Sequence, residues 1–368
     1  MKKHYINCGQ LFTLAILLII SAYIATQNML LVQAEEQVSL SVKEIVDGLT
    51  IEEKVGQMFI VRPEDQADFE VGGICIFGPN ITSADAMRDI IRNQKEKSTI
   101  APFIAVDEEG GRVSRVANSG FFGLRKYKSM EALGKSKNPE VARIVASYIG
   151  GYLSELGYNL DFAPVADVNT NPNNPVIGER AFSDEPKVAS AYVSEYIKGL
   201  HSKGIMATIK HFPGHGDTST DTHTGFVEVN KTWDEMKVCE LITFVDNMND
   251  TDMIMVSHIC CTNVTSDGLP ASLSQEMITG KLRKELGYDG VVITDGLGMA
   301  AIADKYNSAQ TALLAVNAGV DILLLPVDAN QSYQAIVEAV KAGKIPESRI
   351  DESVERILAL KCEYGILD

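Results

Sequence analysis

The chain has 368 residues and a formal net charge of −16, with 45% hydrophobic and 22% charged residues. This length and composition allow a large buried core in one domain or two. The acidic balance argues against nucleic acid and anionic lipid as binding partners.

The N-terminus has the layout of a secretory signal. Two lysines near the start precede an apolar stretch at residues 11–25, and residues 32–34 (VQA) resemble a small-x-small cleavage site. Apolar residues resume at 29–32, so an uncleaved signal anchor is the alternative. We expect residues 1–34 to be a signal peptide or signal anchor of a secreted or cell-surface protein. Any membrane contact is expected through this segment alone.

The six cysteines predict neither a disulfide framework nor a zinc site. Cys8 lies in the signal, and the other five have no paired spacing and no CxxC motif. Cys75 and Cys260 lie in or beside apolar runs, so we expect them to be buried as small hydrophobic residues.

Short apolar, β-branched runs recur along the chain and read as strands buried on both faces, as in a parallel sheet. The eight predicted strands are residues 58–61, 73–77, 103–106, 159–163, 205–209, 253–256, 290–294 and 321–325. Helical spacing falls between and after them, at residues 83–96, 139–156, 186–201, 234–249, 274–286, 308–318, 330–342 and 347–361. Ser83, Asp234 and Ser274 are candidate N-caps.

Eight strand–helix alternations predict a (β/α)8 barrel, with an open doubly wound sheet as the alternative. Four predicted strands end in titratable residues, which are Asp107, Lys210 with His211, His258, and Asp295. In a barrel such residues meet on one face, whereas in an open sheet the chemistry collects at a single switch point. We therefore predict that residues 35–368 form one (β/α)8 barrel.

The most informative stretch is residues 210–223 (KHFPGHGDTSTDTH), which follows a predicted strand and is broken by glycine and proline. Its Asp221 and His223 are spaced to form a dyad in which the carboxylate fixes the imidazole tautomer. A metal site is the rival interpretation, using His211, His215 and His223. We predict no metal, because Pro213 breaks the helical geometry that such ligands need and Lys210 would repel a dication.

Two further segments carry candidate groups. Residues 107–115 (DEEGGRVSR) combine acids, arginines and a Gly-Gly pair that permits a sharp turn, and a salt-bridged turn is the simpler interpretation. Asp295 ends a buried strand, where an aspartate is either catalytic or a helix N-cap. The sequence lacks nucleotide-binding and serine-hydrolase motifs.

Taken together, five motifs resemble glycoside hydrolase family 3, specifically its single-domain β-N-acetylglucosaminidases. They are residues 107–115, 160–169 (LDFAPVADVN), 176–183 (VIGERAFS), 210–216 (KHFPGHG) and 293–295 (ITD). They occur in the family's order and cover roughly residue 49 to the C-terminus, which makes them more specific together than any one motif.

The resemblance implies a role for each matching position. Asp295 is expected to be the nucleophile that forms a glycosyl-enzyme intermediate, and His223 the general acid/base with Asp221 as its partner. The positions expected to hold the terminal sugar are Asp107, Arg115, Arg180, Lys210 and His211, to which we add His258 for its place at a strand end. No cofactor is implied.

These roles fit the chemistry of a retaining glycosidase, which needs a nucleophile and a proton donor near the leaving oxygen. A histidine has a pKa suited to this work near neutrality. Family members that act on plain glucosides usually carry a second domain with a glutamate acid/base, and we expect none after the barrel here, which favours N-acetylglucosamine over glucose.

The chain departs from the family's pattern at two places. Gly296, after the expected nucleophile, stands where relatives often have Asp or Ala, which affects the floor of the pocket. The pair Cys260-Cys261 after His258 is also unusual for the family and affects the aglycone side.

We therefore expect an exo-acting, retaining β-N-acetylhexosaminidase that acts on peptidoglycan- or chitin-derived sugars. A phosphorylase is the first alternative, because a neutral histidine would not repel phosphate. A β-glucosidase of the same family and a non-catalytic sugar-binding barrel are the others. In each case the partner is a carbohydrate.

Overall fold

The computed structural model describes residues 24, 27, 41–219 and 227–367. The chain divides into two compact units, Met1–Gly48 and Leu49–Asp368. In the first unit, the described residues 41–48 are helical. Nearly all of the predicted signal segment lies outside the described residues. Within the described part of the chain, no helix is both long enough and apolar enough to cross a membrane.

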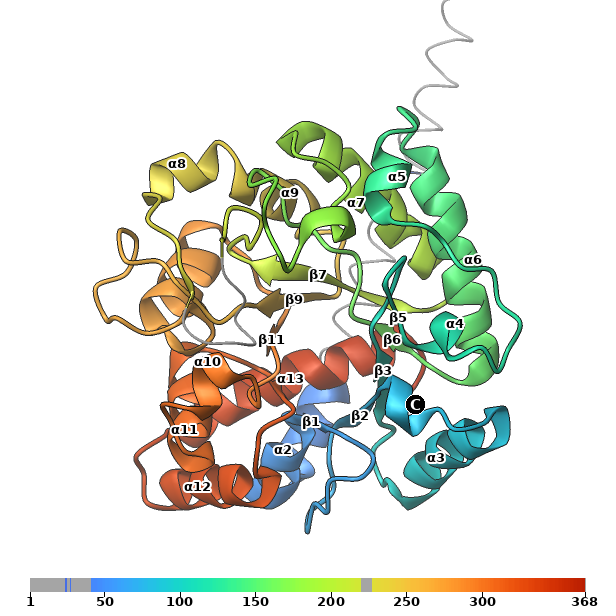
Figure 1. The fold of residues 1–368 in the computed structure, drawn as a ribbon. Helices are drawn as coiled ribbons and strands as arrows, with labels where there is room; N and C mark the ends of the chain where they lie inside the picture. The colour runs from blue at the N-terminus through green and yellow to red at the C-terminus, as the bar shows by residue number, and fades with distance from the viewer. Residues whose placement is uncertain (1–23, 25–26, 28–40, 220–226, 368) are drawn as a thin grey trace, which may run out of the picture. The chain divides into compact units, whose positions relative to one another are not determined.

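The second unit is built on a nearly closed barrel of eight parallel strands (Figure 1). In order around the barrel they are β11 (Val291–Thr294), β9 (Met253–Val256), β7 (Met206–Phe212), β6 (Leu160–Asp161), β3 (Phe103–Val106), β2 (Gly73–Ile76), β1 (Phe59–Val61) and β12 (Leu323–Leu324). A parallel bridge between Ile293 and Ile322 joins the first strand of this order to the last. The predicted barrel is confirmed, and each predicted strand is present: β3 and β9 have the predicted bounds, and the other six have shifted ends.

Helices surround the strands (Figure 1). The longer ones are α3 (Ala84–Lys97), α6 (Glu140–Leu156), α7 (Pro186–His201), α9 (Glu240–Asn247), α11 (Ser308–Ala318), α12 (Ala329–Lys341), α13 (Glu347–Glu363) and the π-helix η4 (Glu276–Glu285). Shorter elements are α2 (Ile51–Gln57), α4 (Arg115–Ser119), α5 (Met130–Gly134), α8 (Trp233–Lys237), α10 (Ala300–Ala303), η1 (Gly78–Asn80), η2 (Gly178–Arg180) and η3 (Ala271–Leu273).

The helix predicted at 234–249 is instead two helices, α8 and α9, with different neighbours. Trp233 on α8 donates to Glu285 of η4 at 2.6 Å, whereas Phe244 on α9 packs edge-on against Phe212 of β7. The N-cap of α8 is Thr232, in a capping box with Glu235, so the predicted cap at Asp234 is wrong.

The other two predicted caps are present. Ser83 accepts a hydrogen bond from the Ala86 N–H, and Ser274 accepts one from the Met277 N–H. Helix α2 was not predicted, although Thr50 and Glu53 form a capping box that marks its start.

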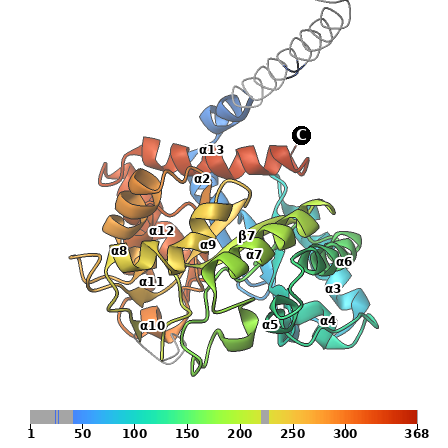
Figure 2. The same ribbon diagram turned by 90° about the horizontal axis from the view of Figure 1, so that it is seen from above.

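The last helix, α13, lies across the N-terminal end of the barrel (Figure 2). Its Ser353 donates to Asp321 at 2.6 Å, just before β12, and its Lys361 donates to the Gly72 carbonyl, just before β2. Arg356 pairs with Asp289, just before β11. These contacts close one end of the barrel, which leaves the carboxyl ends of the strands for loops.

Two small ladders shape those loops. The segment at 107–115 forms an antiparallel hairpin of β4 (Glu108–Gly110) and β5 (Val113–Ser114), with positive φ at Gly110 and Gly111 as the predicted sharp turn requires. Strand β8 (Val227–Glu228) pairs with β10 (Ile259–Cys260). Cys75 and Cys260 are buried as predicted, and the five cysteines of the described residues are all free thiols.

Candidate active site

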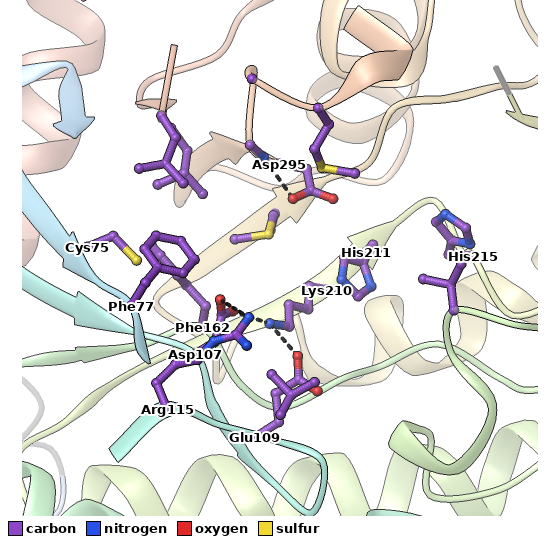
Figure 3. Close-up of a pocket in the computed structure, with 18 of the residues that line it drawn as sticks. Cys75, Phe77, Asp107, Glu109, Arg115, Phe162, Lys210, His211, His215 and Asp295 are labelled. Carbon is purple, nitrogen blue, oxygen red and sulfur yellow. Dashed lines mark hydrogen bonds and ion pairs between the residues drawn. The ribbon is translucent and has the colours of Figure 1, made fainter. Parts of the chain in front are cut away.

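A cavity of about 570 Å³ opens at the carboxyl ends of the barrel strands (Figure 3). Part of its wall consists of residues that directly follow strands, namely Arg62, Phe77, Asp107, Asp295 and Leu325, and of Lys210 and His211, which lie just before the last residue of β7. Small-molecule sites have volumes of about 300–1,000 Å³. The carboxyl face is also where (β/α)8 barrels hold their reactive groups, so this cavity is the candidate active site.

Asp295 directly follows β11 and points into this cavity. Its Oδ1 accepts a hydrogen bond of 2.7 Å from the Gly296 N–H. Burial raises the pKa of the Asp295 carboxyl, but the neighbouring imidazoles of His211 and His258 and the Gly296 N–H outweigh burial. The pKa therefore lies below its ordinary value, and Asp295 is a carboxylate at neutral pH.

Five charged side chains of the cavity form one ion-pair cluster. Four of them lie across the cavity from Asp295 in Figure 3, namely Asp107, Glu109, Arg115 and Lys210. Lys210 Nζ lies 2.8 Å from Asp107 Oδ1 and 2.7 Å from Glu109 Oε1. Arg180 lies 2.7 Å from the same Glu109 oxygen, and Arg115 lies 3.4 Å from Asp107. The cluster offers both donors and acceptors to a ligand rich in hydroxyl groups.

The members of the ion-pair cluster keep one another charged. Burial lowers the pKa of Lys210, but Asp107 and Glu109 outweigh it, so the pKa lies above its ordinary value. Burial raises the pKa of Glu109, yet Arg180 and Lys210 hold it well below its ordinary range. Buried charges persist only with such partners.

An irregularity in β7 brings two consecutive residues to the cavity. Side chains alternate between the faces of a regular strand, so Lys210 and His211 would point in opposite directions. The register of β7 against β9 shifts between Lys210 and Phe212, and both Lys210 and His211 line the cavity. Bulges commonly re-aim side chains beside active sites.

His211 lies between the carboxylate of Asp167 and the guanidinium of Arg180. Its Nδ1 lies 2.6 Å from Asp167 Oδ2, and its Nε2 lies 3.3 Å from Arg180 Nη2. A guanidinium only donates, so Nε2 is the acceptor and the ring proton is on Nδ1. Burial, followed by the charge of Arg180, holds the pKa of His211 well below its ordinary value, so the ring is neutral.

Six of the predicted site residues therefore line one cavity. They are Asp107, Arg115, Arg180, Lys210, His211 and Asp295. The predicted acid/base pair, Asp221 and His223, lies outside the described residues. Among the described residues no three His, Cys, Asp or Glu side chains form a group suited to holding a metal ion. The described histidine His215, from the same motif, contacts Thr218 Oγ1 through its Nδ1 at 2.8 Å.

His258 lies behind the cavity wall, not at its surface as a sugar contact would require. Its side chain is fully buried, with Nδ1 2.7 Å from Ser272 Oγ and Nε2 2.9 Å from the Gly296 carbonyl oxygen. A carbonyl only accepts, so Nε2 carries a proton. His258 thus supports the residue after Asp295, and its place at a strand end did not reveal which side its ring faces.

Two residues of the site were not singled out from the sequence. Glu109 bridges Lys210 and Arg180. It lies two residues after Asp107, and because side chains two residues apart in an extended segment point to the same side, this spacing was a signal that could have identified it. Asp167 lies in the 160–169 motif, but its contact with His211 joins residues far apart in sequence, and no local pattern shows it.

Residues 50–360 match the model of the Glycosyl hydrolase family 3 N terminal domain. Beta-hexosaminidase A of Pseudoalteromonas piscicida is 35% identical over 319 residues, which are 80% of this chain and 53% of that protein. The chain thus spans about half the length of that relative. Beta-hexosaminidase LpqI of Mycobacterium tuberculosis is 33% identical over 332 residues, which are 85% of this chain and 83% of LpqI.

Solved structures agree with these matches. A glycoside hydrolase family 3 β-N-acetylglucosaminidase from Paenibacillus sp. str. FPU-7 has a TM-score of 0.80 and 34% identity, over 86% of this chain and 63% of that one. The β-glucoside phosphorylase BglX has a TM-score of 0.81, over 90% of this chain and 62% of that one, but its 23% identity shows the fold alone. The chain therefore belongs to glycosyl hydrolase family 3, a family of enzymes that act on glycosides.

Proposed function

We propose that the protein is an exo-acting, retaining β-N-acetylhexosaminidase that removes terminal β-N-acetylglucosamine from peptidoglycan- or chitin-derived glycosides. The observation that carries this proposal is Asp295, an ionised carboxylate at a strand end that faces the ion-pair cluster across the cavity. A retaining glycosidase uses such a carboxylate as its nucleophile.

The reaction has two steps. Asp295 attacks the anomeric carbon while the leaving oxygen takes a proton, and a covalent glycosyl-enzyme forms. A water molecule then attacks the same carbon, which releases the sugar and restores the carboxylate. We assign the proton transfers of both steps to His223, oriented by Asp221, on the strength of the sequence motif.

The ion-pair cluster supplies the sugar contacts. Asp107 accepts hydrogen bonds from ring hydroxyls, and Arg115 donates to them, because both side chains are partly open to the cavity. In Figure 3, Lys210 and His211 lie below Asp295 and to the right of Asp107 and Arg115, and both line the same cavity. A sugar held by the cluster would have its anomeric carbon directed at Asp295.

The choice of sugar draws support from the relatives. Those at 33% and 35% identity are named β-hexosaminidases, and the Paenibacillus structure is that of a β-N-acetylglucosaminidase. We further propose a secreted or cell-surface location, which rests on the predicted signal at residues 1–34.

A panel of aryl β-glycosides tests the proposal on the purified chain: the N-acetylglucosaminide, N-acetylgalactosaminide, glucoside and xyloside. We expect the highest kcat/KM with the N-acetylglucosaminide, free N-acetylglucosamine as product, and no dependence on phosphate. A higher kcat/KM with the glucoside than with the N-acetylglucosaminide would make the protein a β-glucosidase. Formation of a sugar 1-phosphate would make the protein a phosphorylase, and sugar binding without turnover would make it a binding protein.

A further inference from the structure

We propose that Glu109 is a positioning residue for this reaction: it holds Lys210 and Arg180 in their charged, oriented forms, and through Arg180 it fixes the hydrogen bonding of His211. This inference rests on the proposed function, because it concerns the groups that hold the sugar.

Both carboxylate oxygens of Glu109 already contact cations of the cluster. Its Oε1 is shared by Lys210 Nζ and Arg180 Nη2, each at 2.7 Å, and its Oε2 accepts from Arg180 Nε at 2.9 Å. Its side chain is 1% exposed. Glu109 therefore acts only through its two cations, and the two-pronged contact fixes the plane of the guanidinium.

The two cations need this carboxylate because both are buried. The side chains of Lys210 and Arg180 are 2% and 11% exposed, and without a counter-charge between them they would repel each other in a medium of low dielectric constant. Asp107 is the other carboxylate bonded to Lys210. Without Glu109, Lys210 would lose one of these two counter-charges and release its proton at a lower pH.

The orientation of Arg180 reaches further, to His211. The same Nη2 that contacts Glu109 lies 3.3 Å from His211 Nε2, while Asp167 holds Nδ1 from the opposite side. Since Arg180 only donates, its position decides that Nε2 accepts. Glu109 thus supports, through Arg180 at Nε2, the same hydrogen bonding of His211 that Asp167 favours at Nδ1.

Glu108 provides a matched control within the same strand. It is as deeply buried as Glu109, but it accepts from Tyr152 Oη and from the backbone N–H groups of Val116 and Ala117. None of these partners is a cation of the cavity. Glu108→Gln therefore disturbs a buried carboxylate in the same hairpin without removing charge from Lys210 or Arg180.

The first test compares Glu109→Gln, Glu109→Asp and Glu108→Gln on an aryl β-N-acetylglucosaminide. We expect Glu109→Gln to lower kcat/KM by about 10²-fold, as for loss of preorganised electrostatic groups, and Glu109→Asp to retain part of the activity because it keeps the charge. Glu108→Gln should lower Tm but leave kcat/KM within about threefold. A Glu109→Gln value within threefold of wild type, or an equal loss in Glu108→Gln, overturns the proposal.

The second test measures how sugar affinity depends on pH, which would not change if Glu109 only stabilised the fold. The affinity for N-acetylglucosamine, measured by calorimetry between pH 6 and 10, should weaken more steeply with rising pH in Glu109→Gln than in wild type, because Lys210 loses its proton earlier. Parallel pH profiles contradict the positioning role. If the wild-type protein neither binds this sugar nor cleaves its aryl glycoside, the proposed function itself fails.

A double variant keeps the test decisive if Glu109→Gln does not fold. Glu109→Gln combined with Lys210→Met removes one charge of each sign, which restores the balance of the cluster. Because Glu109 also holds Arg180, the double variant should lose some activity relative to Lys210→Met alone, but less than the loss of about 10²-fold expected for Glu109→Gln in the wild-type background. A further loss of about 10²-fold or more in the double variant would show that Glu109 acts independently of Lys210 and overturn its assigned role.

Discussion

The Oδ2 atom of Asp167 lies 2.6 Å from the Nδ1 atom of His211, and both side chains are buried. Asp167 Oδ1 also accepts from the backbone N–H groups of His211 and His215, at 3.3 and 2.6 Å. One carboxylate therefore holds the imidazole of His211 and the backbone N–H groups near the end of β7 and just after it. This arrangement requires an ionised Asp167, because a neutral carboxyl would accept less well from three donors.

The titration of Asp167 should set the acid limb of activity. Burial raises the pKa of Asp167 to about 6, so its carboxylate gains a proton as the pH falls through this value. We expect kcat/KM on an aryl N-acetylglucosaminide to fall below about pH 6, since the pKa of Asp295 lies lower. Asp167→Asn should remove the inflection and lower the plateau by tenfold or more. An unchanged inflection in that variant would assign the limb to another group.

Replacing Asp295 with Ala should abolish hydrolysis but leave sugar binding largely intact. A covalent nucleophile has no substitute in the site, so we expect a loss of about 10³-fold or more in kcat. Initial rates and calorimetric affinity for N-acetylglucosamine measure the two effects. Asp234→Ala is a control, since that carboxylate is 88% exposed and pairs with Lys237. Activity of Asp295→Ala within a few-fold of this control would exclude the assignment.

His223→Ala should affect substrates unequally if His223 is the acid/base. An aryl leaving group of low pKa needs little protonation, whereas a sugar leaving group should lose about 10²-fold or more in rate. Azide should partly restore turnover of the aryl substrate, because it replaces the activated water. Asp221→Ala should show the same pattern more weakly. Equal losses for both substrates, without rescue, would place the proton donor elsewhere.

Chelators should leave activity unchanged. In the ion-pair cluster Arg180 faces His211 Nε2, and its charge would repel a dication at that nitrogen. The check is the rate on an aryl substrate after treatment with EDTA and dialysis. Inactivation that added zinc reverses would establish a metal in the reaction.

Lys361 should make stability depend on pH. Its Nζ donates to Gln57 Oε1 and the Gly72 carbonyl, both uncharged, and burial lowers its pKa to about 7. In the unfolded chain the amine keeps its proton to about pH 10. The unfolded state therefore binds more protons between pH 7 and 10, and the free energy of unfolding should rise with pH by up to about 1.4 kcal/mol per unit.

Urea unfolding of wild type and Lys361→Met at pH 7, 8 and 9 measures this effect. The difference in unfolding free energy between the two proteins should change with pH, because the Met variant has no amine to titrate. A constant difference would show that Lys361 keeps an ordinary pKa in the folded protein.

The eight apolar runs predicted parallel strands, because a parallel strand buried on both faces needs a continuous apolar sequence, and the titratable residues at the ends of four of them favoured a barrel over an open sheet. The position of Asp295 followed from the same pattern, since a residue after a barrel strand lies at the carboxyl face. The break between α8 and α9 could not be predicted, because it depends on the packing of Trp233 and Phe244 against different elements. Local helical spacing carries no information about such neighbours.

The sequence by itself determined the fold class, the family motifs and the strand ends that carry Asp107, Lys210 and Asp295, because these depend on local patterns of burial and on order along the chain. Only the tertiary structure decided which charges meet. Glu109 contacts Arg180 across 71 positions, and Asp167 contacts His211 across 44. The tertiary structure also placed His258 behind the cavity wall. Ion pairs and tautomers depend on distances of a few ångströms between segments, and only the closed barrel sets those distances.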